Sequence, residues 1–151
     1  MTTIIKLVIF ALLPLSVTAQ NEDWPPLSYL RSDYRSVSVV AHVVIREAEI
    51  TGRVGGYENW RIVAEVREPF KGKFRKGEVI EYFHGAEAGF KKEYFTGEKI
   101  VFLLADYDRL KKLVRYSVLE NSTLSQTDDR VKKLRLIKKG FTKKRFKQLK
   151  H

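Results

Sequence analysis

Apolar and polar residues alternate through residues 60–83, the clearest strand, turn and strand in the chain. In the first arm, charged residues occupy most odd positions and apolar residues the even ones: Trp60, Ile62, Ala64 and Val66. This period of two is typical of a half-buried strand. Residues 69–77 contain one proline and two glycines, which favour a connection, and the alternation resumes over residues 78–83. The pattern therefore predicts a β-hairpin with a basic tip: Lys71, Lys73, Arg75 and Lys76.

Further strand-like segments lie on both sides of this hairpin. Residues 37–50 are rich in β-branched residues, and their first half is predicted to be buried on both faces. Residues 51–59 contain three glycines and are predicted to be a loop. The apolar run IVFLLA at residues 100–105 is typical of a strand that is covered on both faces, and residues 113–119 supply a further strand.

A glycine-punctuated segment over residues 84–99 keeps three aromatic residues, Phe90, Tyr94 and Phe95. Loops seldom keep aromatic side chains unless these pack against the body or bind something. We therefore expect this segment to close one end of the core. The candidate recognition residues of this loop and of the 51–59 loop are Tyr57, Trp60, Phe90 and Tyr94.

The last part of the chain is predicted to form a helix. Ser125 and Asp128 stand in the Ser-x-x-acid arrangement of a helix start. Beyond Gly140 we expect the helix to fray. The apolar residues that follow Asp128 recur at helical spacing and form a stripe: Val131, Leu134, Ile137 and Phe141.

Five strands in mostly antiparallel neighbouring pairs, followed by one helix, indicate a mainly β fold. We expect a small five-stranded antiparallel OB-like barrel with a C-terminal α-helix, and a β-sandwich is the alternative. The barrel domain with its helix is predicted over residues 37–141, and a basic tail over residues 142–151. An irregular lead-in is predicted over residues 20–36, with room for a short helical turn over residues 27–34.

The first nineteen residues have the anatomy of a secretory signal peptide: a short positive leader, an apolar run and small residues before a cleavage point after Ala19. The apolar run of about eleven residues is shorter than the roughly twenty that span a bilayer. We therefore expect a secreted or periplasmic protein that does not span the membrane after cleavage.

Cysteine is absent from the sequence, which excludes disulfides, thiolate metal sites, a cysteine nucleophile and a lipoprotein anchor. The net charge of +11 is unevenly distributed. Residues 130–151 hold eleven of the 29 basic residues and no acidic one, which leaves eighteen basic residues against eighteen acidic ones elsewhere. The body is therefore electrically balanced, and the end of the chain carries the imbalance.

The basic end predicts either a solvated helix with a solubilising tail or attachment to an anionic surface of lipid headgroups or acidic glycan. Export favours these partners over nucleic acid. The candidate anion-binding residues are Lys132, Lys133, Arg135, Lys138, Lys139, Lys143, Lys144, Arg145 and Lys147.

Catalytic and metal-binding chemistry has little support in the sequence. His42 lies among valines in a predicted strand, and His84 stands at a predicted strand end without a nucleophile motif nearby. Two histidines without clustered carboxylates are a weak metal signal. We expect no catalytic residue, metal or cofactor, and therefore no enzyme.

The chain resembles the netrin-like module of the tissue inhibitor of metalloproteinases superfamily in four segments: SVVAHVVI, WRIVAEVREPFKG, KGEVIEYF and FKKEYFTGEKIVFLLA. The family turn Val-x-x-x-(Phe/Tyr)-Lys-Gly is matched by Val66, Phe70, Lys71 and Gly72. The later family motif is matched by Gly97, Glu98, Lys99, Ile100, Val101 and Phe102. This resemblance, over residues 27–140, implies an OB-like barrel with a terminal helix and a secreted binding module without an active site.

Inhibitors of that family place an amino-terminal cysteine over a protease zinc. This chain would begin at Gln20 and has no cysteine, so the resemblance does not carry that chemistry here. Our first hypothesis is an exported non-enzymatic module that binds a protein or an anionic envelope or extracellular component. The alternatives are a protease inhibitor that inserts residues 51–59 or 85–97, a single-stranded nucleic-acid or polysaccharide binder that stacks its ligand on Trp60, Tyr82 and Phe90, and a hydrolase that uses His84.

Overall fold

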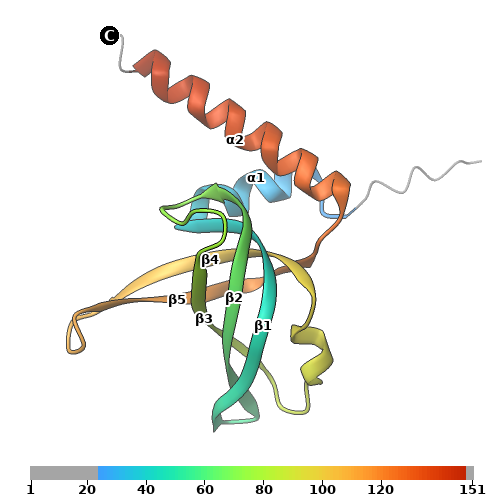
Figure 1. The fold of residues 1–151 in the computed structure, drawn as a ribbon, viewed down its shortest axis with the longest axis vertical. Helices are drawn as coiled ribbons and strands as arrows, with labels where there is room; N and C mark the ends of the chain where they lie inside the picture. The colour runs from blue at the N-terminus through green and yellow to red at the C-terminus, as the bar shows by residue number, and fades with distance from the viewer. Residues whose placement is uncertain (1–23, 149–151) are drawn as a thin grey trace, which may run out of the picture.

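The computed structural model describes residues 24–148, without the side chains of residues 120, 121 and 143–148. Five strands close into a barrel in the order β1-β2-β3-β5-β4, and two helices lie against one side of it (Figure 1). In chain order, the elements are α1 (Leu27–Ser36), β1 (Val39–Val54), β2 (Tyr57–Lys71), β3 (Val79–Glu87), the short 3-10 helix η1 (Lys92–Phe95), β4 (Glu98–Asp108), β5 (Leu113–Ser125) and α2 (Asp128–Gln148).

The barrel has one parallel join, between β3 and β5, whereas its other neighbouring strands are antiparallel. A closed ring with an odd number of strands cannot alternate direction all the way round, so at least one neighbouring pair must run in the same direction. The expected mainly β, OB-like barrel with a C-terminal helix is therefore confirmed, with this single departure from antiparallel pairing.

Two apolar cores lie on the two sides of β1 and β4. The inner core fills the barrel and includes Ala41, Val43, Ile62, Tyr82, Val101 and Leu103. The outer core joins the barrel to both helices and includes Leu30, Tyr34, Val40, Ile100, Phe102, Leu134 and Ile137. The prediction of strands covered on both faces is thus confirmed for the first half of β1 and for residues 100–103, whereas Leu104 is already exposed.

Residues 27–36 form helix α1, where we expected an irregular lead-in with at most a short turn. Pro26 stands just before the helix, and its carbonyl oxygen accepts bonds from the amides of Tyr29 and Leu30 at 3.1 and 3.2 Å. A proline at this position loses no helical hydrogen bond, because the first amides of a helix have no partner within it. Leu30 and Tyr34, four residues apart, then fix the helix in the outer core.

Residues 51–59 form the end of a β-hairpin, which corrects the predicted loop. The strands β1 and β2 continue to Val54 and from Tyr57, and only Gly55 and Gly56 stand between them. Both glycines have positive φ angles, 57° and 84°, as the tight turns that join twisted strands require. Gly52 lies instead at a register irregularity within β1.

The Phe-Lys-Gly turn at the end of β2 holds helix α1 on the barrel. The hydroxyl of Tyr34 donates to the carbonyl oxygen of Phe70 at 2.7 Å, and the ammonium of Lys71 donates to the carbonyl oxygens of Tyr34, Arg35 and Val37 at the end of α1. We call Tyr34, Phe70 and Lys71 the α1 clasp. Lys71 is therefore a helix cap rather than part of a free basic hairpin tip.

Helix α2 begins at Asp128, where Thr127, not Ser125, provides the capping oxygen. The Thr127 hydroxyl oxygen accepts the amide of Arg130 at 3.3 Å, while Ser125 is the last residue of β5. The predicted apolar stripe is confirmed, since Val131, Leu134 and Ile137 are buried. The helix continues past the single glycine at position 140 to Gln148, so residues 142–148 of the predicted tail are helical. Within residues 24–148, no helix is long and apolar enough to cross a membrane.

Candidate binding pocket at the barrel seam

The join between β3 and β5 is the thinnest part of the barrel wall. Among the described residues these two strands share a single ladder pair, Phe83 opposite Ser117. β5 then bends away, because Val118 pairs with Leu103 whereas the next paired residue, Thr123, lies opposite Val101. Among the described pairings, residues 84–87 of β3 pair with β2 on one side and with no strand on the other.

A half-enclosed cavity of about 340 Å³ opens at this seam, and we call it the seam pocket. Its walls come from β3, β5, the start of β2 and the η1 segment. The lining residues are Tyr57, His84, Gly85, Ala86, Glu87, Phe90, Tyr94, Val118, Leu119 and Thr123.

Two polar groups that belong to lining residues of the seam pocket lack hydrogen-bond partners in the described part of the chain. They are Nδ1 of His84 and the hydroxyl of Thr123, and both atoms are buried. The imidazole of His84 lies edge-on to Phe95, with ring centroids 5.1 Å apart, and burial lowers its pKa so that the ring is neutral at pH 7. Both atoms are covered by the protein itself, so a ligand could reach them only if the side chains around them moved.

Aromatic rings form the rim of the seam pocket. Phe90 and Tyr94 stand perpendicular to each other with centroids 4.7 Å apart, and the ammonium of Lys99 lies 5.2 Å from the Tyr94 ring centre. The buried ring of Phe95 anchors this segment, because it packs at 4.7 Å against Trp60 inside the barrel. Part of the pocket lining is therefore aromatic, and the rings of Phe90 and Tyr94 remain partly exposed.

Three of the four predicted recognition residues, Tyr57, Phe90 and Tyr94, line the seam pocket together. The prediction for Trp60 was wrong. Its side chain is only 4% exposed, because its even position in β2 points into the barrel. Tyr82 is interior for the same reason. The stacking surface for nucleic acid that required these two rings is therefore not formed.

Thr123 was not recognised as a site residue, and His84 was considered only as a catalytic base. The alternation of β3 could have placed His84 inside the barrel, since it shares a face with Ile80 and Tyr82. Nothing local signals Thr123, because its position depends on the bend in β5 opposite Phe102.

Some basic residues of α2 bond to other parts of the protein, and others have no described partner. Lys133 pairs with Asp129 at 2.7 Å, Arg135 binds both carboxylate oxygens of Glu68 at 2.9 and 2.7 Å, and Lys138 donates to a barrel carbonyl oxygen at 2.8 Å. Arg135 keeps the pKa of Glu68 below its usual range through this hydrogen-bonded pair. Lys132, Arg135, Lys138 and Lys139 are all exposed, and of these only Lys132 and Lys139 have no described bond to the barrel. The side chains of Lys143, Lys144, Arg145 and Lys147 lie outside the described residues.

The two histidines in the described chain have different surroundings. Nε2 of His42 lies 3.1 Å from a carboxylate oxygen of Glu98 on the neighbouring strand, whereas His84 faces the seam pocket. Among the described residues, no group of three or more histidine, aspartate or glutamate side chains could hold a metal ion.

Comparison with known proteins gave no match: neither a protein-family model nor a curated protein matches this sequence.

Proposed function

We propose that the protein is a non-enzymatic binding module whose seam pocket receives an extended segment of a partner protein. The observation that carries this proposal is the edge of β3 over residues 84–87, which has no described partner strand on one side and borders the seam pocket. An extended peptide laid along such an edge gains main-chain hydrogen bonds as an added strand, and its side chains enter the adjoining pocket.

The shape and chemistry of the seam pocket select the side chain that enters. A cavity of about 340 Å³ accommodates one large side chain of a bound peptide. The perpendicular rings of Phe90 and Tyr94 favour a flat apolar body at the entrance. His84 and Thr123 also line the pocket, and their covered polar atoms would bond a polar end group, as tyrosine has, once the side chains around them moved. We therefore expect an aromatic anchor residue in the partner.

A selection from a displayed library of random peptides tests this function directly. Selected peptides are expected to change the amide NMR signals of residues 84–87 and of Val118 and Thr123, and to contain a recurrent aromatic residue. Tyr94→Ala is expected to weaken peptide affinity at least tenfold, because a buried aromatic contact commonly carries more than about 1.4 kcal/mol of binding energy. Tyr107→Ala, which removes an exposed tyrosine outside the pocket, is the matched control and should leave the affinity unchanged.

Selected peptides whose signals map elsewhere on the protein, or a library that yields no binder, would end the proposal. Equal losses of affinity in Tyr94→Ala and Tyr107→Ala would mean that the peptide does not use the seam pocket.

We also propose that the protein is exported and distantly related to netrin-like modules. The barrel order and the helix-holding role of Phe70 and Lys71 support the relationship, since these residues belong to the turn that carries the resemblance. The proposed leader lies outside the described residues. Mass spectrometry of the protein expressed with its leader should find a mature chain that begins at Gln20, and a chain that keeps residues 1–19 would contradict export by this route.

A further inference from the structure

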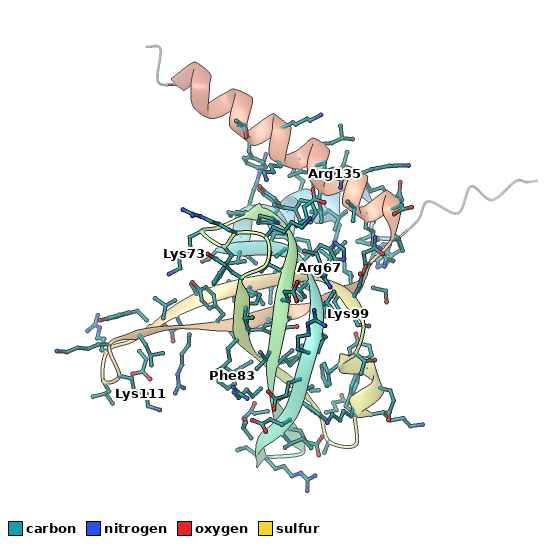
Figure 2. All side chains as sticks on the ribbon, viewed as in Figure 1. Arg67, Lys73, Phe83, Lys99, Lys111 and Arg135 are labelled. Carbon is teal, nitrogen blue, oxygen red and sulfur yellow. The ribbon has the colours of Figure 1, made fainter. Side chains whose placement is uncertain are left out.

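The hairpin of β4 and β5 extends beyond the barrel as a free arm. We call residues 104–117 the arm, and Figures 1 and 2 show it projecting away from the other strands, with Lys111 labelled at its end. Its strands pair with each other from Leu104 opposite Ser117 to Asp108 opposite Leu113. β1 pairs with β4 only as far as Leu103, so the arm has no described neighbour strand along either edge, apart from the single pair at its root.

A rigid turn at the end of the arm presents one leucine to solvent. A carboxylate oxygen of Asp108 accepts the amides of Leu110 and Lys111, both at 3.0 Å, and Lys112 takes a left-handed φ of 51°. These contacts fix the turn and place the Leu110 side chain at 97% exposure, the highest of any large apolar residue in the described chain. Single exposed leucines are common on protein surfaces, and Leu110 is distinguished by its position at the apex of a projecting turn.

Cations surround this leucine. Arg109, Lys111 and Lys112 form the rest of the turn and are exposed. The acid nearest to them, Asp108, is turned toward the backbone amides and toward Arg115, whose Nε lies 3.5 Å away. The end of the arm therefore presents an apolar apex within a ring of positive charge.

We propose that the arm docks on a bilayer that contains anionic lipids, with Leu110 inserted among the headgroups and Arg109, Lys111 and Lys112 paired with lipid phosphates. The apolar side chain at the apex matches the boundary between headgroups and acyl chains, and the basic side chains beside it match the charged headgroups. This site is separate from the seam pocket and stands independently of the peptide-binding function.

The type of exposed apolar residue favours lipid over nucleic acid. The exposed apolar side chains of the arm are mainly aliphatic, namely Leu104, Leu110, Leu113 and Val114, with Tyr107 as the aromatic exception. Single-stranded nucleic acid is held by aromatic rings on which bases stack. Charges that only protect the open strand edges from aggregation would explain the lysines but not a fully exposed leucine between them.

A dye placed at the apex tests insertion, and the absence of cysteine from the chain makes single-site labelling straightforward. The full-length protein is labelled at Leu110→Cys with an environment-sensitive fluorophore and mixed with vesicles of phosphatidylcholine containing roughly a third phosphatidylglycerol, a composition with a strong negative surface potential. We expect a blue shift with these vesicles and none with pure phosphatidylcholine. Val54→Cys is the matched control, because Val54 lies at the other hairpin end, is 74% exposed, and has a neighbouring arginine already paired with Glu58 at 3.0 Å.

Vesicle co-sedimentation of unlabelled variants separates the electrostatic contribution to vesicle binding from the contribution of the inserted leucine. Lys111→Gln is expected to weaken vesicle affinity about fivefold, the effect of one cation near an anionic membrane. Leu110→Ser should weaken it about tenfold or more without changing the salt dependence. Lys132→Gln on α2 is the charge-matched control and should have a smaller effect than Lys111→Gln.

Several results would overturn the proposal. These are equal blue shifts at positions 54 and 110, no shift at 110, or a shift at 110 with an anionic polymer such as heparin that equals the shift with vesicles. An affinity that responds to Lys132→Gln but not to Lys111→Gln would assign membrane binding to α2 instead of the arm.

Discussion

The buried tyrosine hydroxyls of the two cores differ in their hydrogen bonding. The hydroxyl of Tyr34 in the outer core donates to the carbonyl oxygen of Phe70 at 2.7 Å. The hydroxyl of Tyr82 in the inner core has no partner among the described residues, and burial raises its pKa. A buried polar group contributes to stability only when it is paired, so the two tyrosines should respond differently to loss of the hydroxyl.

Tyr34→Phe is expected to lower the free energy of unfolding by about 1 to 2 kcal/mol, because it removes a buried hydrogen bond and leaves a carbonyl oxygen unpaired. Tyr82→Phe should raise it by about 1 kcal/mol, because it removes an unpaired buried hydroxyl. Urea unfolding of both variants measures the two changes. Destabilisation by Tyr82→Phe similar to that by Tyr34→Phe would show that the Tyr82 hydroxyl is paired in solution.

The burial of His84 makes stability depend on pH. Burial lowers the pKa of His84 in the folded chain, so at mildly acidic pH the unfolded chain binds the additional proton. Stability should therefore fall as the pH drops below about 6.5, the ordinary pKa of histidine, until it reaches the lowered pKa of the folded state. His84→Phe keeps a ring beside Phe95 but cannot titrate. Urea unfolding at pH 7.5 and 5.0 should show a smaller pH effect for His84→Phe than for the unmodified protein, and equal effects would contradict the prediction.

At the scale of secondary structure elements, the α1 clasp connects the first helix to the end of β2. Lys71 reaches three carbonyl oxygens at the end of α1, and its burial lowers the pKa of the amine. Gly72 follows with a φ of 103°, and a Cβ atom there would lie 3.1 Å from a methyl group of Val39 and 3.2 Å from the carbonyl oxygen of Ser38. The turn thus needs both a long cation and a residue without a side chain.

Gly72→Ala should destabilise the protein by about 1 to 3 kcal/mol, because alanine is strained at this φ and too close to the backbone of residue 38. Lys71→Met keeps the length of the side chain but loses the bonds to α1, and we expect a smaller loss of about 1 kcal/mol. Thermal unfolding measures both. Gly77→Ala, at a positive φ with open space around the added methyl group, is the control that separates strain from crowding. Equal losses in Gly72→Ala and Gly77→Ala would contradict the role of crowding.

Elements with a strong local period could be predicted from the sequence, and elements defined by remote contacts could not. The alternation after Trp60 and the apolar stripe of α2 reflect burial of one face, which is visible residue by residue. Helix α1 was missed because the prolines before it were taken as a sign of irregular chain. The 51–59 loop was predicted wrongly because three glycines were read together, although Gly55 and Gly56 alone form the turn.

The seam pocket was predicted only in part, because some of its residues are placed by contacts with remote parts of the chain. The aromatic residues of its rim stand out in a glycine-rich segment, so Phe90 and Tyr94 were identified. The position of Thr123 depends on where β5 bends away from β3, and that bend is set by pairing with residues of β4 that lie fifteen or more positions earlier in the chain. No local pattern records such a register change.

The strands of the barrel are joined by many backbone pairs on one side, between β1 and β2, and by few on the other, between β3 and β5. β1 and β2 share a long ladder, whereas β3 and β5 share one pair. Backbone amides in weakly connected regions exchange their hydrogens through small local openings.

We therefore expect hydrogen–deuterium exchange to be faster for residues 84–87 and 118–123 than for residues 39–45 and 62–66, with rates that differ by at least tenfold, which corresponds to about 1.4 kcal/mol of local stability. Mass spectrometry of peptic fragments measures this difference. A bound peptide from the library selection should slow exchange at 84–87, whereas uniform exchange around the barrel would show that the seam is as stable as the rest.

The parallel join has a consequence for how such a protein acquires new specificity. A ring of five strands must contain at least one pair of neighbours that run the same way, and in this chain that pair borders the seam pocket and lies at the root of the arm. Residues exchanged there leave the β1–β2 and β1–β4 ladders untouched. The one join that the geometry of an odd ring imposes is thus where we expect the barrel to tolerate sequence changes best, because it shares no residue with the β1–β2 and β1–β4 ladders.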